Sequence, residues 1–165
     1  MKLALLIVDI QKEFFKPNPV VAQSLNDAIR YINAAIALFR GKGLPVISVQ
    51  HKNEGSNLVP GEEGFELPEE LDILPTDLHI YKTHGNSFNK TPLADEMRNL
   101  DVDTIIITGF CAEYCVLSTY RGALDIDLTP IILRGSLASG NLKNIKFVES
   151  ISDIISIGVL QKMLG

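Results

Sequence analysis

The sequence predicts an α/β fold with three layers, in which a Rossmann-like central parallel sheet of about six strands carries helices on both faces. Short continuous apolar runs, typical of strands buried on both faces, alternate along the chain with amphipathic helical segments. Such alternation is typical of parallel sheets with helical crossovers. The 165 residues suit one domain. No repeat or linker divides them, so we expect a single domain over residues 1–165.

The first strand and the first helix illustrate both patterns. The run "LALLIV" at 3–8 is too short for a helix and predicts a buried strand. Apolar residues then recur every three to four positions over Ser24–Arg40, which predicts a helix. Ser24 with Asp27 suits the N-cap of this helix, and Gly41 suits its end.

The remaining elements continue the alternation. Further strands are predicted at "PVISV" (45–49), "LHIY" (78–81), "TIIIT" (104–108), "LTPIIL" (128–133) and, briefly, near "DIISI" (153–157). Further helices are predicted after Thr91-Pro92, from near Cys115 to about Leu124, and over roughly 141–151. Pro130 favours an edge or irregular position for its strand. The stretch 51–77 is rich in Gly, Glu, Asn and Pro and predicts a long functional loop.

Composition and charge narrow the possible partners. The balance of 15 Lys and Arg against 20 Asp and Glu gives a net charge of −5, which argues against nucleic acid as the main partner. No apolar run approaches the roughly 20 residues needed to span a bilayer. Asp9 interrupts the apolar start and no cleavage site follows, so we interpret it as a strand rather than a signal peptide. Two cysteines are too few for a disulfide framework, and we expect a cytoplasmic protein.

Three reactive residues lie where predicted strands end. Asp9 follows the first strand, Lys82 follows the third, and Cys115 begins the helix after the fourth. Parallel strands would bring all three to one edge of the sheet, where ligands bind in such folds. The helix N-terminus and the lysine cation should both lower the pKa of the thiol. The pattern predicts a nucleophile, Cys115, with Asp9 as base and Lys82 as orienting cation.

The spacing of the two cysteines bears on whether they form a metal or redox site. Structural zinc needs about four N or S ligands, and the histidines at 51, 79 and 84 show no ligand spacing with the cysteines. A redox pair would normally be Cys-x-x-Cys, whereas Cys111 and Cys115 are four apart. We therefore expect Cys111 to be a neighbour of the nucleophile rather than a partner in its chemistry.

Three segments together resemble the isochorismatase-like cysteine hydrolases. They are "LLIVDIQKEFF" (5–15), "YKTHGNSFNKTPL" (81–93) and "IIITGFCAEYCVLSTYRGA" (105–123), and the likeness extends over essentially the whole chain. The resemblance implies that Asp9, Lys82 and Cys115 form the family's catalytic triad. It also implies a non-proline cis peptide at Phe110–Cys111, which helps aim the N–H groups of Cys111 and Cys115 at the reacting oxygen.

Other positions follow from the resemblance or depart from it. Gln11 matches an Asp-x-Gln motif and is expected to hold Asp9 or the loop in place. Nicotinamidases of the family carry a metal site that begins Asp-x-His after the second strand. Here "VQHKNEG" offers only His51, so we expect no metal and no cofactor.

The resulting prediction is a hydrolase that acts on a small amide, carbamoyl or related C–N compound through a thioester. Phe14, Phe88 and Tyr114 are candidate walls of the substrate pocket, and Gln50 and His51 are candidate substrate contacts. The resemblance also implies a homo-oligomer, either a dimer or a larger assembly. Alternatives are an isochorismatase-type hydrolase of another small molecule, a catalytically silent binding scaffold, and a receiver-like signalling module, which would need further acidic residues at the strand ends.

Overall fold

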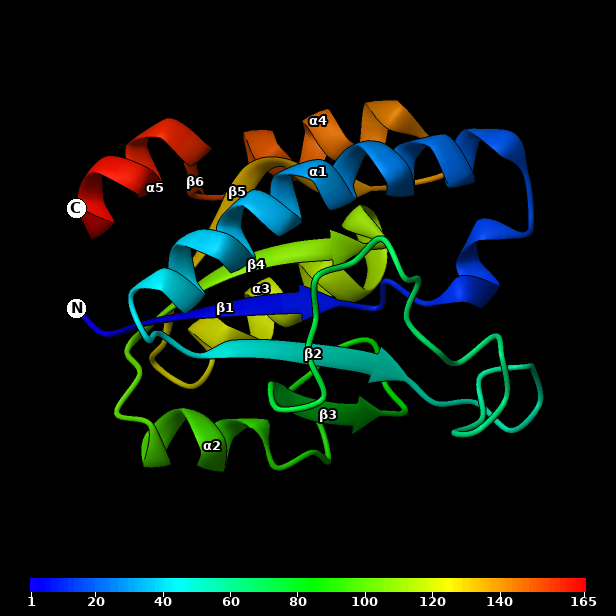
Figure 1. Cartoon of the computed structure of the whole chain (residues 1–165), viewed down its shortest axis with the longest axis horizontal. Helices are drawn as coiled ribbons and strands as arrows, with labels where there is room; N and C mark the ends of the chain where they lie inside the picture. Colours follow the sequence, from blue (N-terminus) through cyan, green and yellow to red (C-terminus); the bar gives the residue numbers. More distant parts are fainter.

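A single parallel sheet of six strands forms the centre of the molecule, as the sequence predicts (Figure 1). The computed structural model describes residues 1–165. The strand order is β3-β2-β1-β4-β5-β6, and every neighbouring pair is parallel. The strands are β1 (Leu3–Val8), β2 (Val46–His51), β3 (Leu78–Lys82), β4 (Thr104–Phe110), β5 (Thr129–Ala138) and β6 (Ile154–Ile155).

Helices cover both faces of this sheet. They are α1 (Pro19–Gly41), α2 (Leu93–Asn99), α3 (Leu117–Leu124), α4 (Leu142–Ser150) and α5 (Ile157–Leu164). Alternate residues of β1 enter two separate apolar cores, as expected for a strand buried on both faces. One core joins β1 to α1 and α5, and the other joins it to α2, α3 and Val148 of α4. No helix combines the length and apolar character that a membrane crossing requires.

The first helix begins five residues earlier than predicted, at Pro19 instead of Ser24. Asn18 is its N-cap, and the Asn18 side chain accepts a hydrogen bond from the Val21 N–H at 2.9 Å. Pro19 at the first helical position needs no N–H partner and suits this start. Ser24 is instead buried inside the helix, where its hydroxyl accepts a hydrogen bond from the Ser139 N–H.

The segment around the two cysteines differs most from the prediction. Strand β4 continues through Gly109 and Phe110, and a π-helical turn (Ala112–Val116) then leads into α3. Cys111 is the N-cap of that turn, so Cys115 is its fourth residue and not the first residue of a helix. A π turn depends on i→i+5 hydrogen bonds that no simple residue pattern reveals.

Two other predictions at the C-terminal end need correction. Strand β5 extends to Ala138 and lies between β4 and β6. Strand β6 pairs only with Ile132 and Leu133, so the part of β5 that contains Pro130 pairs with β4 alone. Pro130 therefore lies at a position paired on one side only, which agrees with the predicted edge position, and it is in regular register with Ile105. Helix α5 was not predicted; Ser156 caps it by accepting a hydrogen bond from the Val159 N–H.

The strand order also tests the alternative that the chain is a receiver-like signalling module. The observed order is that of doubly wound dinucleotide-binding folds, whereas receiver domains have the order 2-1-3-4-5. The receiver-like alternative is therefore wrong. In the observed order the direction of winding reverses between β1 and β4, and the crevice beyond their carboxyl ends is the expected ligand site.

Candidate active site

The carboxyl ends of three strands bring Asp9, Lys82 and Cys115 together. The Lys82 ammonium donates hydrogen bonds to Asp9 Oδ2 at 2.8 Å and to Cys115 Sγ at 3.3 Å. Lys82 is the last residue of β3 and Asp9 directly follows β1, and both side chains are almost fully buried. Asp9 has a left-handed backbone with φ of 53°, which turns the chain sharply out of β1. The ion pair is therefore enclosed at the edge of the sheet.

The other carboxylate oxygen of Asp9 lacks a partner. Asp9 Oδ1 is buried and accepts no hydrogen bond. Buried carboxylate oxygens are normally hydrogen-bonded, so an unpartnered one beside a thiol marks an atom free to take a proton. Ligand atoms of Asp9, His51 and Cys115 lie within 4.8 Å of one another, so the Asp9 carboxylate has a thiol within short reach.

Asp9, His51 and Cys115 are residue types that bind metal ions, but the position of Lys82 makes this group unsuitable as a metal site. The ammonium contacts His51 Nδ1 at 3.0 Å as well as Asp9 and Cys115. It therefore lies where a cation shared by these three residues would lie. A metal ion there would face the positive charge of Lys82 at close range, so the residues present do not fit a metal.

Contact with Lys82 also fixes the tautomer of His51. An ammonium can only donate, so His51 Nδ1 must accept its hydrogen bond. Burial and the charge of Lys82 lower the pKa of His51, which keeps the ring neutral at neutral pH. The neutral ring then carries its proton on Nε2. His51 is thereby a hydrogen-bond donor on the wall of the site.

The pKa of the Cys115 thiol differs from the prediction. Burial and the neighbouring Asp9 charge raise it to about 12, against the lowering effect of Lys82. The expected decrease was wrong because Cys115 lies inside the π turn rather than at a helix N-terminus, and because its burial raises the pKa more than Lys82 lowers it. Burial likewise raises the pKa of Asp9. The Cys115 thiol is therefore protonated at neutral pH.

A cavity of about 400 Å³ opens onto these groups. Its lining residues are Asp9, Phe14, His51, Asn53, Leu58, Phe110, Cys111, Tyr114 and Cys115. Phe14, His51 and Tyr114 thus lie at the cavity, as predicted for candidate substrate contacts. Asn53, Leu58 and Phe110 line it too, and sequence reasoning did not propose them as pocket walls. Asn53 and Leu58 belong to the long loop, whose lack of periodicity hides which residues turn inward.

Three other predicted site residues lie outside the cavity. Phe88 packs against the apolar core under α2 and α3. Gln50 is buried and donates to the Phe65 carbonyl, beside a separate hollow lined by Tyr81 and His79. Gln11 makes no hydrogen bond to Asp9; of its two expected roles it has the one toward the loop, since it exchanges hydrogen bonds with the His51 backbone and donates to the Phe65 carbonyl. Gln11 and Gln50 therefore tie the long loop to the strand that carries His51.

The peptide between Phe110 and Cys111 is cis, as the resemblance implies. The Cys111 thiol lies 3.1 Å from the Glu113 carboxylate, which also accepts hydrogen bonds from Ser139 and Asn144. Burial and Glu113 raise the pKa of Cys111 to about 12. Sequence reasoning missed Glu113 and Ser139, because the partners of Glu113 lie just after β5 and in α4. They anchor the turn that carries both cysteines.

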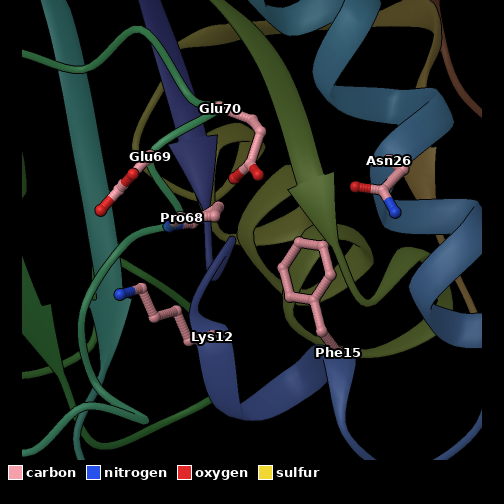
Figure 2. Close-up of a pocket in the computed structure, with 6 residues that line it drawn as sticks. All are labelled: Lys12, Phe15, Asn26, Pro68, Glu69 and Glu70. Carbon is pink, nitrogen blue, oxygen red and sulfur yellow. The ribbon is translucent and has the colours of Figure 1, made fainter.

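A second hollow lies beside the N-terminal 3-10 turn (Lys12–Phe15) and is separate from this site (Figure 2). Its lining residues are Lys12, Phe15, Asn26, Pro68, Glu69 and Glu70. It holds no thiol, and its Lys12 side chain is a single cation near two carboxylates. Asp9, His51 and Cys115 therefore line a different cavity from this one.

Comparison with known proteins agrees with the sequence resemblance. A family model described as the isochorismatase domain matches residues 3–147. The isochorismatase family protein YddQ of Bacillus subtilis is 30% identical over 129 residues, covering 76% of this chain and 71% of YddQ. Ureidoacrylate amidohydrolase RutB of Pseudomonas syringae is 24% identical, covering 79% of this chain and 68% of RutB. The structure of N-carbamoylsarcosine amidase from Thermoplasma acidophilum has a TM-score of 0.84 at 22% identity, covering 95% of this chain and 97% of the amidase.

Proposed function

This chain belongs to the isochorismatase family of hydrolases, and we propose that it is a cysteine-dependent amidohydrolase of a small amide, carbamoyl or related C–N compound. The observation that carries the proposal is the Lys82 ammonium in contact with both Asp9 and Cys115, two residues that line the same cavity. A nucleophile, a base and an orienting cation within hydrogen-bond reach are what covalent acyl transfer requires.

Acylation begins with the neutral thiol. Asp9 accepts the proton from Cys115 Sγ through its unpartnered Oδ1 as the sulfur attacks the carbonyl carbon of the substrate. The raised pKa of Asp9 suits this step, because a base whose pKa is closer to neutrality holds the proton better. The C–S bond forms and the carbonyl electron pair moves onto oxygen. Lys82 keeps the carboxylate and the developing thiolate side by side.

Charge on the carbonyl oxygen is stabilised by the backbone N–H groups of Cys111 and Cys115. The Cys111 N–H makes no hydrogen bond within the chain and is available as a donor. Collapse of the tetrahedral intermediate breaks the C–N bond, and Asp9 returns its proton to the leaving nitrogen. Such oxyanion stabilisation typically contributes about 3–4 kcal/mol per donor.

The second half of the reaction hydrolyses the thioester. Asp9 takes a proton from water, the hydroxide attacks the acyl carbon, and the C–S bond breaks. The thiolate recovers a proton from Asp9, which restores the resting site and releases the acid product. The names of RutB and of the N-carbamoylsarcosine amidase support a C–N bond as the target.

The test is ammonia release from a panel of primary amides, ureas and carbamoyl compounds. Cys115→Ala should reduce kcat/KM on any active compound by at least about 10³-fold, as expected for loss of a covalent nucleophile. Gln23→Ala, on the exposed side of α1, is the matched control and should retain full activity. Full activity in Cys115→Ala would overturn the proposal, and so would a panel without any turnover.

A further inference from the structure

The cavity that contains Cys115 has no cation available to a ligand. Its ionisable lining residues are Asp9, His51, Tyr114 and the two cysteines, and it includes no lysine or arginine. The nearest cation, Lys82, is only 1% exposed and does not line the cavity. Its ammonium, which has three protons to donate, already contacts Asp9, His51, the His84 carbonyl and Cys115.

A carboxylate in the lining makes this cavity unfavourable for an anion, and the neutral histidine adds no positive charge that would offset it. Asp9 contributes a carboxylate close to where the reacting carbonyl must lie. His51 is neutral and offers one N–H donor, which suits a carbonyl or amide oxygen as well as an anion. A carboxylate taken from water into such surroundings would lose its hydration without gaining an ion pair.

The walls offer apolar contacts instead. The rings of Phe14 and Phe110 lie 4.9 Å apart at an interplanar angle of 41°, and Leu58 is buried beside the cavity. Tyr114 is the most exposed of the lining aromatic residues, at 68%. The cavity volume is at the small end of the range for ligand sites of about 300–1,000 Å³. It therefore suits a compact apolar group next to one amide.

We propose that the substrate is an uncharged amide or urea with an apolar substituent that lies against Phe14, Leu58 and Phe110, and that amides bearing a carboxylate are excluded. This inference rests on the proposed function and adds the substrate class. The reacting carbonyl faces Cys115, and the substituent points toward the aromatic wall. Charge, rather than size, decides between substrates of equal length.

The experiment compares matched pairs in which a terminal methyl group is replaced by a carboxylate. The pairs are butyramide with succinamate, propylurea with 3-ureidopropanoate, and 4-methylbenzamide with 4-carbamoylbenzoate. The neutral member of at least one pair should be hydrolysed with kcat/KM at least about 100-fold above that of its acidic partner, because the site leaves the carboxylate unpaired.

A pair of variants tests whether charge is the cause. Tyr114→Arg places a cation at the exposed mouth of the cavity and should reduce the neutral-to-acid preference by about tenfold or more, the size of a single charge-assisted contact. Tyr114→Phe keeps the ring without the cation and should leave the preference ratio unchanged. An unchanged ratio in Tyr114→Arg would overturn the charge argument.

The outcomes separate this inference from the function on which it rests. Turnover that depends on Cys115 but favours the acidic members, or treats both alike, would overturn the inference and leave the amidohydrolase proposal standing. Activity on other amides of the panel but on none of these six compounds would also overturn the inference. Only a panel without any Cys115-dependent turnover would overturn both.

Discussion

At the scale of single residues, the site is organised around the buried charge of Lys82. Removing one partner of a buried ion pair typically costs about 3–5 kcal/mol, because the other charge is left uncompensated. Here the remaining charge would be Asp9, next to the thiol that we propose as the nucleophile. Lys82 therefore affects both the stability of the site and the ionisation of its nucleophile.

The first prediction concerns the ionisation of Cys115. Asp9 raises the thiol pKa and Lys82 lowers it, so Lys82→Met should raise the pKa further and Asp9→Asn should lower it. A change of one unit corresponds to about 1.4 kcal/mol and to a tenfold change in thiolate at any pH below the pKa. At pH 9, Cys115 should therefore react with iodoacetamide about tenfold more slowly in Lys82→Met and faster in Asp9→Asn.

Peptide mapping after alkylation distinguishes Cys115 from Cys111. Both variants should lose turnover, since one lacks the orienting cation and the other lacks the proton acceptor. If the Cys115 alkylation rates of the two variants match that of the wild type, neither charge lies beside the thiol and the proposed triad is wrong.

A second prediction concerns the acid limb of the pH profile. Asp9 must be ionised to accept the thiol proton, and burial raises its pKa above the ordinary 3.8. As the pH falls, Asp9 therefore becomes protonated earlier than an exposed aspartate would, and kcat/KM should decrease at a pH above 3.8. A pH–rate profile measured where circular dichroism shows intact protein would test this, and an acid limb at or below 3.8 would contradict it.

At the scale of elements, the sequence was most informative where one local signal determined the outcome. The buried strands are continuous apolar runs, and β1 has the predicted bounds. The start of α1 was misplaced because Ser24 and Asp27 resembled a cap, whereas the real cap is Asn18 before Pro19. The π turn could not be predicted, since its hydrogen bonds follow from the path that the chain takes after β4.

The third prediction tests how closely β4 must approach β1. Gly109 has φ of +117°, and a Cβ atom there would overlap the Val8 backbone, lying 2.7 Å from its nitrogen. Because backbone cannot move aside cheaply, Gly109→Ala should destabilise the protein by more than about 4 kcal/mol, in the range reserved for severe substitutions. Urea denaturation, or loss of soluble protein, would measure this.

Gly158 provides the matched control for this substitution. It lies in α5 with no atom within 4 Å of an added Cβ and without a positive φ. Gly158→Ala should therefore stabilise the protein by about 0.5–1 kcal/mol. Equal effects at the two glycines would show that the approach of β4 to Val8 is not tight.

At the scale of the whole molecule, the parallel sheet explains why residues far apart in the sequence could be predicted to lie close together. Asp9, Lys82 and Cys115 were linked only by the rule that parallel strands end at one edge, and the hydrogen bonds of Lys82 agree with it. The cavity walls from the loop depend on long-range packing that this rule does not describe, and so do the partners of Glu113 just after β5 and in α4. The expected homo-oligomer stays a prediction.

The same topology places the proposed active site and helix α5 at opposite ends of the sheet, and α5 contributes to stability. Figure 1 shows α5 near the beginnings of β1 and β4, whereas the reactive residues lie at the opposite, carboxyl ends of the strands. Leu160 of α5 is fully buried in the core shared with α1. Loss of the Leu160 side chain should therefore lower the stability of the fold without changing the geometry of the proposed active site.

We expect Leu160→Ala to cost about 2–5 kcal/mol, because it leaves a cavity in a packed core. For a chain of this size each kcal/mol lowers Tm by about 2–4 °C. At 25 °C, where the variant remains folded, its kcat/KM on the best amide should equal that of the wild type. Val159→Ala removes an exposed neighbour on the same helix and should change stability by no more than about 0.5 kcal/mol. Calorimetry and steady-state kinetics on both variants test this separation, and a loss of activity in folded Leu160→Ala would show that the two ends of the sheet are coupled.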